Sequence, residues 1–165
     1  MEKETRMPGQ NVIRPELFLM DMTAVSDEDA LEQLASLLYR HGLVRESFGE
    51  AVKERERRYS TGLSFPEMGI AIPHAGAEHV IAPAAAVGIL KEPVKFRHMG
   101  MPQELVETEL IFMLAIREEE EQPEQLAGLL DVFQGEGNLT RLQACRTKEE
   151  AADCLTELLQ SVDRQ

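Results

Sequence analysis

Near its middle the chain reads Gly69-Ile70-Ala71-Ile72-Pro73-His74-Ala75-Gly76, a short apolar run that ends in a histidine. Small and β-branched residues at 69–72 are typical of a short buried strand. Pro73 has no N–H to donate, so strand pairing is expected to stop there and to leave His74 at the carboxyl end of the strand. In open α/β sheets, ligands and chemistry are usually found at this edge. His74 is therefore the first candidate functional residue.

The residues before this strand predict another strand and two helices. A strand is expected within residues 17–20. Ser26 is a candidate N-cap of a helix that ends near Gly42, because serine favours the start of a helix and glycine its end. A second helix is expected from 45 to 58, and most members of its charged run at 53–58 are interpreted as a solvated helix end.

Apolar patterns after His74 predict more strands and then helices. The strongest signal is the apolar run within 107–116, typical of a central strand. Shorter runs predict a strand at 84–90 and an edge strand at 94–96. Three closing helices are expected from periodicity and capping residues, beginning at Pro123, Asn138 and Thr147. The order of elements predicts a single-domain α/β (α+β) fold, a central mixed β-sheet flanked by helices.

The length and charge of the chain limit its organisation and its partners. With 165 residues, 43% of them hydrophobic, it is expected to form one domain at 16–162, preceded by a loose polar arm at 1–15. Its 17 basic and 30 acidic residues give a formal net charge of −13. This charge argues against nucleic-acid binding, which needs a basic surface, and is compatible with a basic protein partner.

Cysteine spacing and hydropathy indicate an ordinary cytoplasmic protein. Cys145 and Cys154 lack metal-ligand spacing and are interpreted as buried free thiols. No apolar run approaches the ~20 residues that span a bilayer. Residues 1–6 are not followed by the apolar core of a signal peptide, so we expect a cytoplasmic location and no insertion into a membrane.

His74 is either a functional group or a structural loop histidine. The sequence contains no nucleophile elbow, P-loop or dinucleotide fingerprint. A neutral imidazole can itself attack a phosphoryl group and leave again, and the reaction needs nearby positive charge, which the run ending at Arg58 could supply. A metal site built from His74, Glu78 and His79 is the alternative, but its spacing is unlike that of known zinc motifs.

Two motifs in fixed order resemble a known family. They are Arg55-Glu56-x-x-Tyr59-Ser60-Thr61-Gly62-Leu63 and the stretch from Gly69 to His74. Together they resemble the enzyme IIA (type 2) domain of the fructose–mannitol class of the bacterial phosphoenolpyruvate:sugar phosphotransferase system (PTS), over about residues 17–159. The family has a central mixed sheet flanked by helices and uses no metal or organic cofactor.

The resemblance also implies roles for individual residues. His74 matches the histidine that accepts a phosphoryl group from the histidine-containing phosphocarrier protein and passes it to a cysteine of a IIB component. Arg55 matches the arginine that stabilises the phosphate, and Thr61 is expected to donate a hydroxyl hydrogen bond nearby. Whether His79 touches the phosphate stays open.

One departure from the family pattern points to a subgroup. Mannitol- and fructose-type members have a second active-site histidine where this chain has Gln125, whose amide can make a polar contact but carries no charge. Galactitol-type members resemble this chain at that position and at 73–80 and 91–96. The resemblance therefore favours uptake of galactitol or a related polyol, with the sugar chosen by the membrane component. A regulatory, nitrogen-type IIA protein is the alternative.

Overall fold

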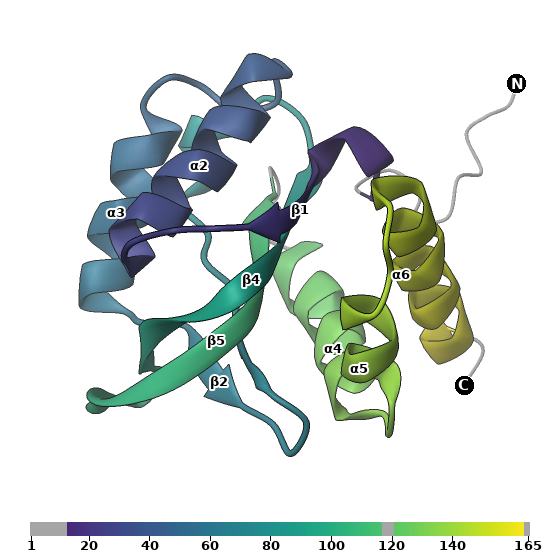
Figure 1. Cartoon of the computed structure of the whole chain (residues 1–165). Coiled ribbons are helices and arrows are strands. Elements are labelled where there is room, and N and C mark those ends of the chain that lie inside the picture. The colour runs from purple at the N-terminus through teal and green to yellow at the C-terminus, as the bar shows by residue number, and fades with distance from the viewer. Residues whose placement is uncertain (1–12, 117–120, 164–165) are drawn as a thin grey trace, which may run out of the picture.

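The computed structural model describes residues 13–116 and 121–163, with side chains described over 13–116 and 128–162. A five-stranded mixed sheet forms the middle layer (Figure 1). Two helices cover one face of it and three cover the other, so the predicted fold class is confirmed. The elements are η2 (Pro15–Leu17), β1 (Phe18–Met22), α2 (Asp27–Arg40), α3 (Phe48–Arg58), β2 (Gly62–Ser64), β3 (Gly69–Ala71), η3 (Ala77–His79), β4 (Ala84–His98), β5 (Met101–Ala115), α4 (Glu121–Gln134), α5 (Asn138–Gln143) and α6 (Lys148–Asp163).

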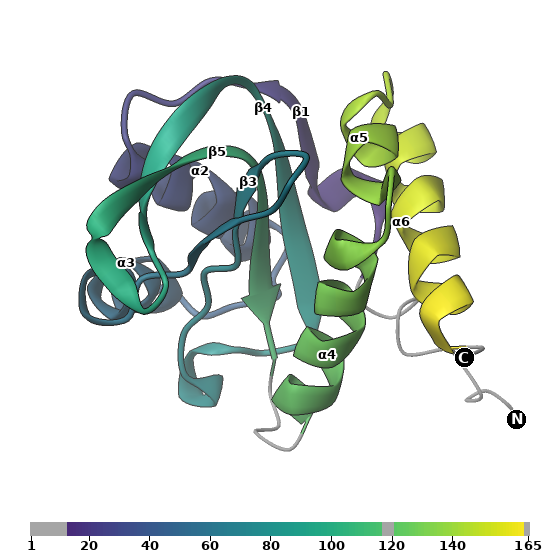
Figure 2. The ribbon, with the colours of Figure 1, turned by 90° about the horizontal axis from the view of Figure 1, so that it is seen from below.

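The strands pair in the order β1-β4-β2-β3-β5, and β4 also pairs with β5 in a long antiparallel hairpin. β3 lies parallel to β5 and antiparallel to β2, and Gly62 of β2 pairs with both Ala71 and His98. The pairings β4–β5, β5–β3, β3–β2 and β2–β4 therefore form a closed circuit. Figure 2 shows β3 beside β5 on the side away from β1.

The two strands predicted at 84–90 and 94–96 are a single strand, β4, which corrects the prediction of a separate edge strand. The ladder between β4 and β5 shifts register between Ile89 and Val94. Pro93, which cannot donate to a ladder, lies within this irregularity and is exposed.

The buried residues form two hydrophobic clusters, one on each face of the sheet. Strand β5 contributes side chains to both, because its side chains alternate between the two faces. Leu110, Phe112 and Leu114 pack on the side of α4, α5 and α6, whereas Ile111 and Met113 pack on the side of α2 and α3. Both faces are thus covered, which explains why this strand reads as an unbroken apolar run.

The ends of α2 match the sequence signals, whereas α3 begins at Phe48 and not at 45, and α4 begins at Glu121 and not at Pro123. Ser26 Oγ accepts the Asp29 N–H at 3.1 Å, and Gly42 follows α2 with φ of 72°. The prediction that Asn138 caps α5 is wrong, since the N-cap is Gly137 with φ of 81°. The Glu67 carboxylate, from the turn between β2 and β3, accepts N–H groups at this helix start instead, including that of Thr140 at 3.0 Å.

Most of the arm expected at 1–15 lies outside the described residues. Of its last three residues, Ile13 is buried in the core and Pro15 begins η2. Within the described part of the chain, no helix has both the length and the apolar character needed to cross a membrane.

Candidate active site

His74 lies at the edge where β3 and β5 end, as the sequence predicts. The segment Ile72-Pro73-His74 follows directly after β3, and His74 forms an isolated parallel bridge with Leu114. The Leu114 N–H donates to the Pro73 carbonyl at 2.9 Å. Pro73 therefore donates no N–H to a neighbouring strand, while its carbonyl accepts a hydrogen bond that holds the segment against β5.

The imidazole of His74 is partly buried and held in one tautomer. Its Nδ1 lies 3.0 Å from the Ile72 carbonyl oxygen. Because a carbonyl can only accept, Nδ1 carries the hydrogen and Nε2 keeps a lone pair. Burial lowers the pKa of the ring, the Ile72 hydrogen bond opposes this shift, and the positive charge of Arg55 lowers the pKa further. The ring is therefore neutral and nucleophilic at neutral pH.

Arg55 is the cation that acts on this ring. It lies in the last turn of α3, is exposed, and places its guanidinium carbon 5.3 Å from the centre of the Tyr59 ring. This cation–π contact orients a side chain that would otherwise be free to rotate. Among residues 13–116 and 128–162, no carboxylate forms a salt bridge with Arg55, so its charge is available to an anion.

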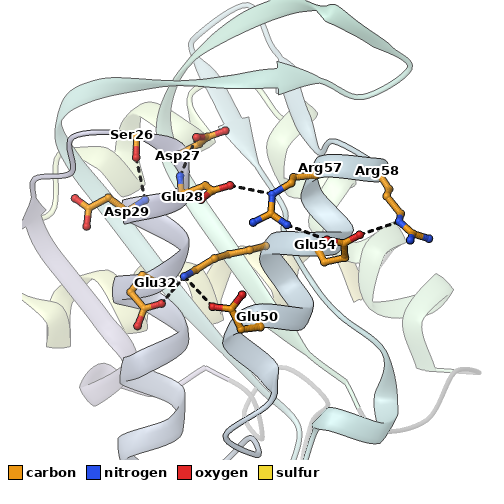
Figure 3. Close-up of polar contacts among 10 residues, drawn as sticks. Ser26, Asp27, Glu28, Asp29, Glu32, Glu50, Glu54, Arg57 and Arg58 are labelled. Atoms are coloured by element: carbon orange, nitrogen blue, oxygen red, sulfur yellow. Dashed lines mark hydrogen bonds and ion pairs between the residues drawn. The ribbon is translucent and has the colours of Figure 1, made fainter.

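The other basic residues of the run are paired with acids on α2 and α3 (Figure 3). Arg57 contacts Glu28 at 3.0 Å and Glu54 at 2.8 Å, and Arg58 contacts Glu54 at 3.0 Å. These residues form the solvated, internally paired helix end that the sequence predicts.

Thr61 is buried, and its hydrogen bonds hold the site together. Its Oγ1 donates to the Glu56 carboxylate at 3.0 Å and accepts the Ile72 N–H at 3.2 Å. The described geometry brings Thr61 to the segment that carries His74, with its single hydroxyl proton directed at Glu56. A hydrogen bond from Thr61 to a phosphoryl group stays a prediction.

Glu56 belongs to the site as well, although the sequence analysis assigned it no role. It lies in the charged run, yet only 7% of it is exposed, and its carboxylate also accepts the Thr61 N–H at 2.8 Å. Burial raises its pKa to about 7, against the hydrogen bonds from Thr61. The available signal was its spacing: Phe48, Val52 and Glu56 are four residues apart and so share the buried face of α3.

Two other residues that the sequence singles out, His79 and Gln125, are not seen in contact with His74 among the described residues. His79 Nδ1 lies 2.7 Å from Ser47 Oγ and Nε2 lies 3.5 Å from a Glu78 oxygen, so both ring nitrogens have partners outside the His74 segment. The backbone of Gln125 lies in α4, but its side chain is outside the described residues. Over the described side chains, no three His, Cys, Asp or Glu residues converge as metal ligands.

Curated relatives include components of sugar phosphotransferase systems and a transcriptional regulator. The chain is 29% identical over 120 residues to the transcriptional regulator ManR of Bacillus subtilis, which covers 73% of this chain and 17% of ManR. It is 33% identical over 102 residues to the PTS system fructose-specific EIIABC component of the same organism, covering 60% and 15%. It is 26% identical over 130 residues to the ascorbate-specific PTS system EIIA component of Shigella boydii, covering 78% and 81%. The chain thus spans less than a fifth of the first two relatives.

Solved structures share the fold at lower identity. A crystal structure described as a PTS IIA, PtxA, of Streptococcus mutans has a TM-score of 0.75 at 23% identity, covering 92% of this chain and 96% of that one. The complex of mannitol enzyme IIA with phosphorylated enzyme IIB of Escherichia coli gives 0.68 at 21%, covering 88% and 95%. The nitrogen regulatory protein IIA-Ntr of Neisseria meningitidis gives 0.65 at 22%, covering 89% and 97%.

A family model decides the assignment. Residues 11–158 match the model described as "Phosphoenolpyruvate-dependent sugar phosphotransferase system, EIIA 2". This span includes both sequence motifs and every side chain of the site described above. The chain therefore belongs to this family, the enzyme IIA domains of the fructose–mannitol class, which are phosphotransferases and phosphocarriers.

Proposed function

We propose that His74 receives a phosphoryl group from the histidine-containing phosphocarrier protein and passes it to a cysteine of a IIB component. The observation that carries this proposal is the 3.0 Å hydrogen bond from Nδ1 to the Ile72 carbonyl, which leaves the Nε2 lone pair as the nucleophile. The nearby charge of Arg55 supports it, because phosphoryl transfer depends on compensation of charge on the equatorial oxygens.

Each transfer is a displacement at phosphorus. Nε2 of His74 bonds to phosphorus as the P–N bond of the donor breaks, and the donor ring keeps the electron pair. The IIB thiolate then bonds to phosphorus as the P–Nε2 bond breaks, and His74 recovers its lone pair. Because Nδ1 keeps its proton, the loaded ring is cationic and leaves as a neutral imidazole. Gln125 is proposed as an uncharged polar contact at the position of the family's second histidine.

Phosphorylation by purified donors tests this proposal. The chain is incubated with phosphoenolpyruvate, enzyme I and the phosphocarrier protein, and an acid-labile adduct of about 80 Da, one phosphoryl group, is expected by mass spectrometry. His74→Ala should carry no adduct. His41→Ala, which alters a histidine at the end of α2, should be loaded normally. An adduct of full yield on His74→Ala would contradict the proposal.

We further propose that the system imports galactitol or a related polyol. Gln125 and the resemblance of residues 73–80 and 91–96 to galactitol-type members support this choice. Two of the named relatives are described as fructose-specific and ascorbate-specific, so the assay compares these two compounds with mannitol and galactitol in vesicles that contain the cognate IIB and IIC components. Uptake of a sugar other than a polyol would contradict the assignment.

A regulatory role is the second candidate, in which phosphorylation of His74 changes the affinity for a protein partner. The similarity to the transcriptional regulator ManR and the fold shared with IIA-Ntr support this regulatory role. Transfer of the phosphoryl group from His74 to a IIB cysteine distinguishes the two. A loaded chain that no IIB accepts, but that binds a regulator differently from the unloaded chain, would favour regulation.

A further inference from the structure

A continuous chain of hydrogen bonds leads from α3 to the His74 ring. The Glu56 carboxylate accepts both the N–H and the hydroxyl of Thr61, at 2.8 and 3.0 Å. Thr61 Oγ1 accepts the Ile72 N–H at 3.2 Å, and the Thr61 carbonyl shares that N–H at 3.4 Å. The Ile72 carbonyl accepts the Nδ1–H of His74 at 3.0 Å. Glu56, Thr61 and Ile72 are all buried.

In this series of hydrogen bonds, the groups that can only accept determine which partner donates at each step. Above its pKa of about 7 the Glu56 carboxylate is ionised and can only accept, so at pH 8 it takes the single hydroxyl proton of Thr61 and leaves an oxygen lone pair for the Ile72 N–H. Ile72 is thereby held through its N–H, while its carbonyl faces the imidazole. Which nitrogen of a histidine carries the proton is set by the partner of the other nitrogen. The position of this one carbonyl therefore decides whether Nε2 has a lone pair.

We propose that Glu56 and Thr61 are positioning residues for phosphoryl transfer, which together hold the Ile72 carbonyl where it selects the nucleophilic tautomer of His74. The inference rests on the proposed function for its catalytic consequence. This role does not require contact with the phosphoryl group, because it acts through the Thr61 hydroxyl that donates to Glu56 and accepts from Ile72. Burying a glutamate costs free energy, and the hydrogen bonds that it makes here end at the reacting ring, which gives the residue a role that packing alone does not.

The first test measures the tautomer of His74 directly, without phosphorylation. Nitrogen-15 NMR of the ring at pH 8 is compared in the wild type and in Thr61→Val, which keeps the side-chain shape but removes the hydroxyl. Wild type should show Nδ1–H, and Thr61→Val should show a substantial Nε2–H population. Thr61→Ser should restore the wild-type spectrum. Ser60→Ala is the matched control, because the neighbouring Ser60 hydroxyl donates to the His98 carbonyl and not to this chain.

Glu56→Gln provides a second variant. Its amide replaces one acceptor oxygen by an NH₂ group, which can donate to Thr61 Oγ1 and compete there with the Ile72 N–H, so a tautomer mixture between those of wild type and Thr61→Val is expected. If Thr61→Val does not fold, the nitrogen-15 spectrum of Glu56→Gln alone tests whether these hydrogen bonds set the tautomer of His74. Folded variants that keep the wild-type Nδ1–H signal would overturn the proposal and leave Glu56 and Thr61 with a packing role only.

The second test measures the initial rate of phosphorylation by the loaded phosphocarrier protein. A misplaced nucleophile typically costs about ten- to a hundred-fold in rate, and Thr61→Val should fall in this range while Thr61→Ser and Ser60→Ala stay near wild type. A shifted tautomer with an unchanged rate would overturn the catalytic consequence. If even the wild type takes up no phosphoryl group, the proposed function fails, whereas the NMR result still decides whether the chain of hydrogen bonds fixes the ring.

Discussion

At the scale of single residues, the site combines the neutral ring of His74 with the guanidinium of Arg55, which has no carboxylate partner among the side chains that the structure describes. His74 lies partly buried at the end of β3, and its pKa is lowered first by burial and then by the charge of Arg55. A lowered pKa keeps the imidazole unprotonated in slightly acidic solution, where a free histidine would be charged. The same arginine that disfavours a proton on the ring would favour the dianionic group that replaces it.

We expect Arg55→Ala to raise the pKa of His74 toward its usual value, because a nearby positive charge is removed. The measurement is an NMR titration of the His74 ring protons. Arg58→Ala is the control, since Arg58 is paired with Glu54 and does not contribute to the shift at His74. Equal titration curves for wild type and Arg55→Ala would show that the two side chains do not interact.

Glu56 makes the stability of the fold depend on pH. Its pKa is near 7 in the folded chain and near 4.5 when unfolded, so the folded state binds more protons between these values and stability falls as pH rises through this window. The stability of Glu56→Gln relative to that of wild type should therefore be greater at pH 8 than at pH 5, by about 2–3 kcal/mol. Urea unfolding at the two pH values measures it, and a pH-independent difference would contradict the raised pKa.

At the scale of elements, β3 is a short strand that depends on close approach to β5. A Cβ on Gly69 would collide with the backbone carbonyl of Glu107, which cannot move aside as a side chain can. By contrast, a Cβ on Gly49 of α3 would lie at an ordinary 3.7 Å from the Ala35 Cβ. Gly69 and Gly49 therefore differ in how much space surrounds them: Gly69 has no room for a Cβ, and Gly49 has.

Gly69→Ala is expected to destabilise the fold by about 1–3 kcal/mol, because the overlap forces β3 away from β5. Gly49→Ala, the matched control, should change stability by less than about 1 kcal/mol and in the stabilising direction, since alanine favours a helix. Urea denaturation compares them. Equal effects of the two substitutions would mean that the approach of β3 to β5 is looser than described.

The elements that the sequence predicted are those with a strong local signal. Helix α2 has a serine cap and a clear apolar face, and the core of β5 is an unbroken apolar run. The continuity of β4 could not be predicted, because Lys91-Glu92-Pro93 has the local properties of a loop and lies at the register shift between the pairs Ile89–Leu110 and Val94–Thr108 with β5. The role of Glu56 was missed for the related reason that its hydrogen-bond partner, Thr61, lies outside α3, whereas its neighbours in the sequence are exposed charged residues.

At the scale of the whole molecule, the sheet separates two cores. Figure 1 shows α2 and α3 on one side of the sheet and α4, α5 and α6 on the other. Leu34 of α2 belongs to the cluster under α2 and α3, Leu155 of α6 belongs to the cluster under α4, α5 and α6, and both side chains are fully buried. They share no cluster, so their contributions to stability should be independent while the fold unfolds as one unit.

Leu34→Val and Leu155→Val are each expected to lower the free energy of unfolding by about 1 kcal/mol, the value of one buried methylene group. The double variant should show the sum within about 0.5 kcal/mol, as sites without shared partners usually do. Urea unfolding followed by circular dichroism and by fluorescence of a probe on either face checks this. A coupling above 1 kcal/mol, or different midpoints from the two probes, would argue against independent cores in one cooperative unit.

The closed circuit of strand pairings has a consequence for how the carrier meets its two partners. β3 cannot slide without breaking ladders to β2 and β5 together, so the anchor point of the imidazole should stay in place whether the ring is empty or loaded. Donor and acceptor proteins would then encounter the same docking shape. The net direction of phosphoryl transfer would then follow from the relative free energies of the P–N bond in the donor and the P–S bond in the acceptor. No conformational change of the carrier would be needed.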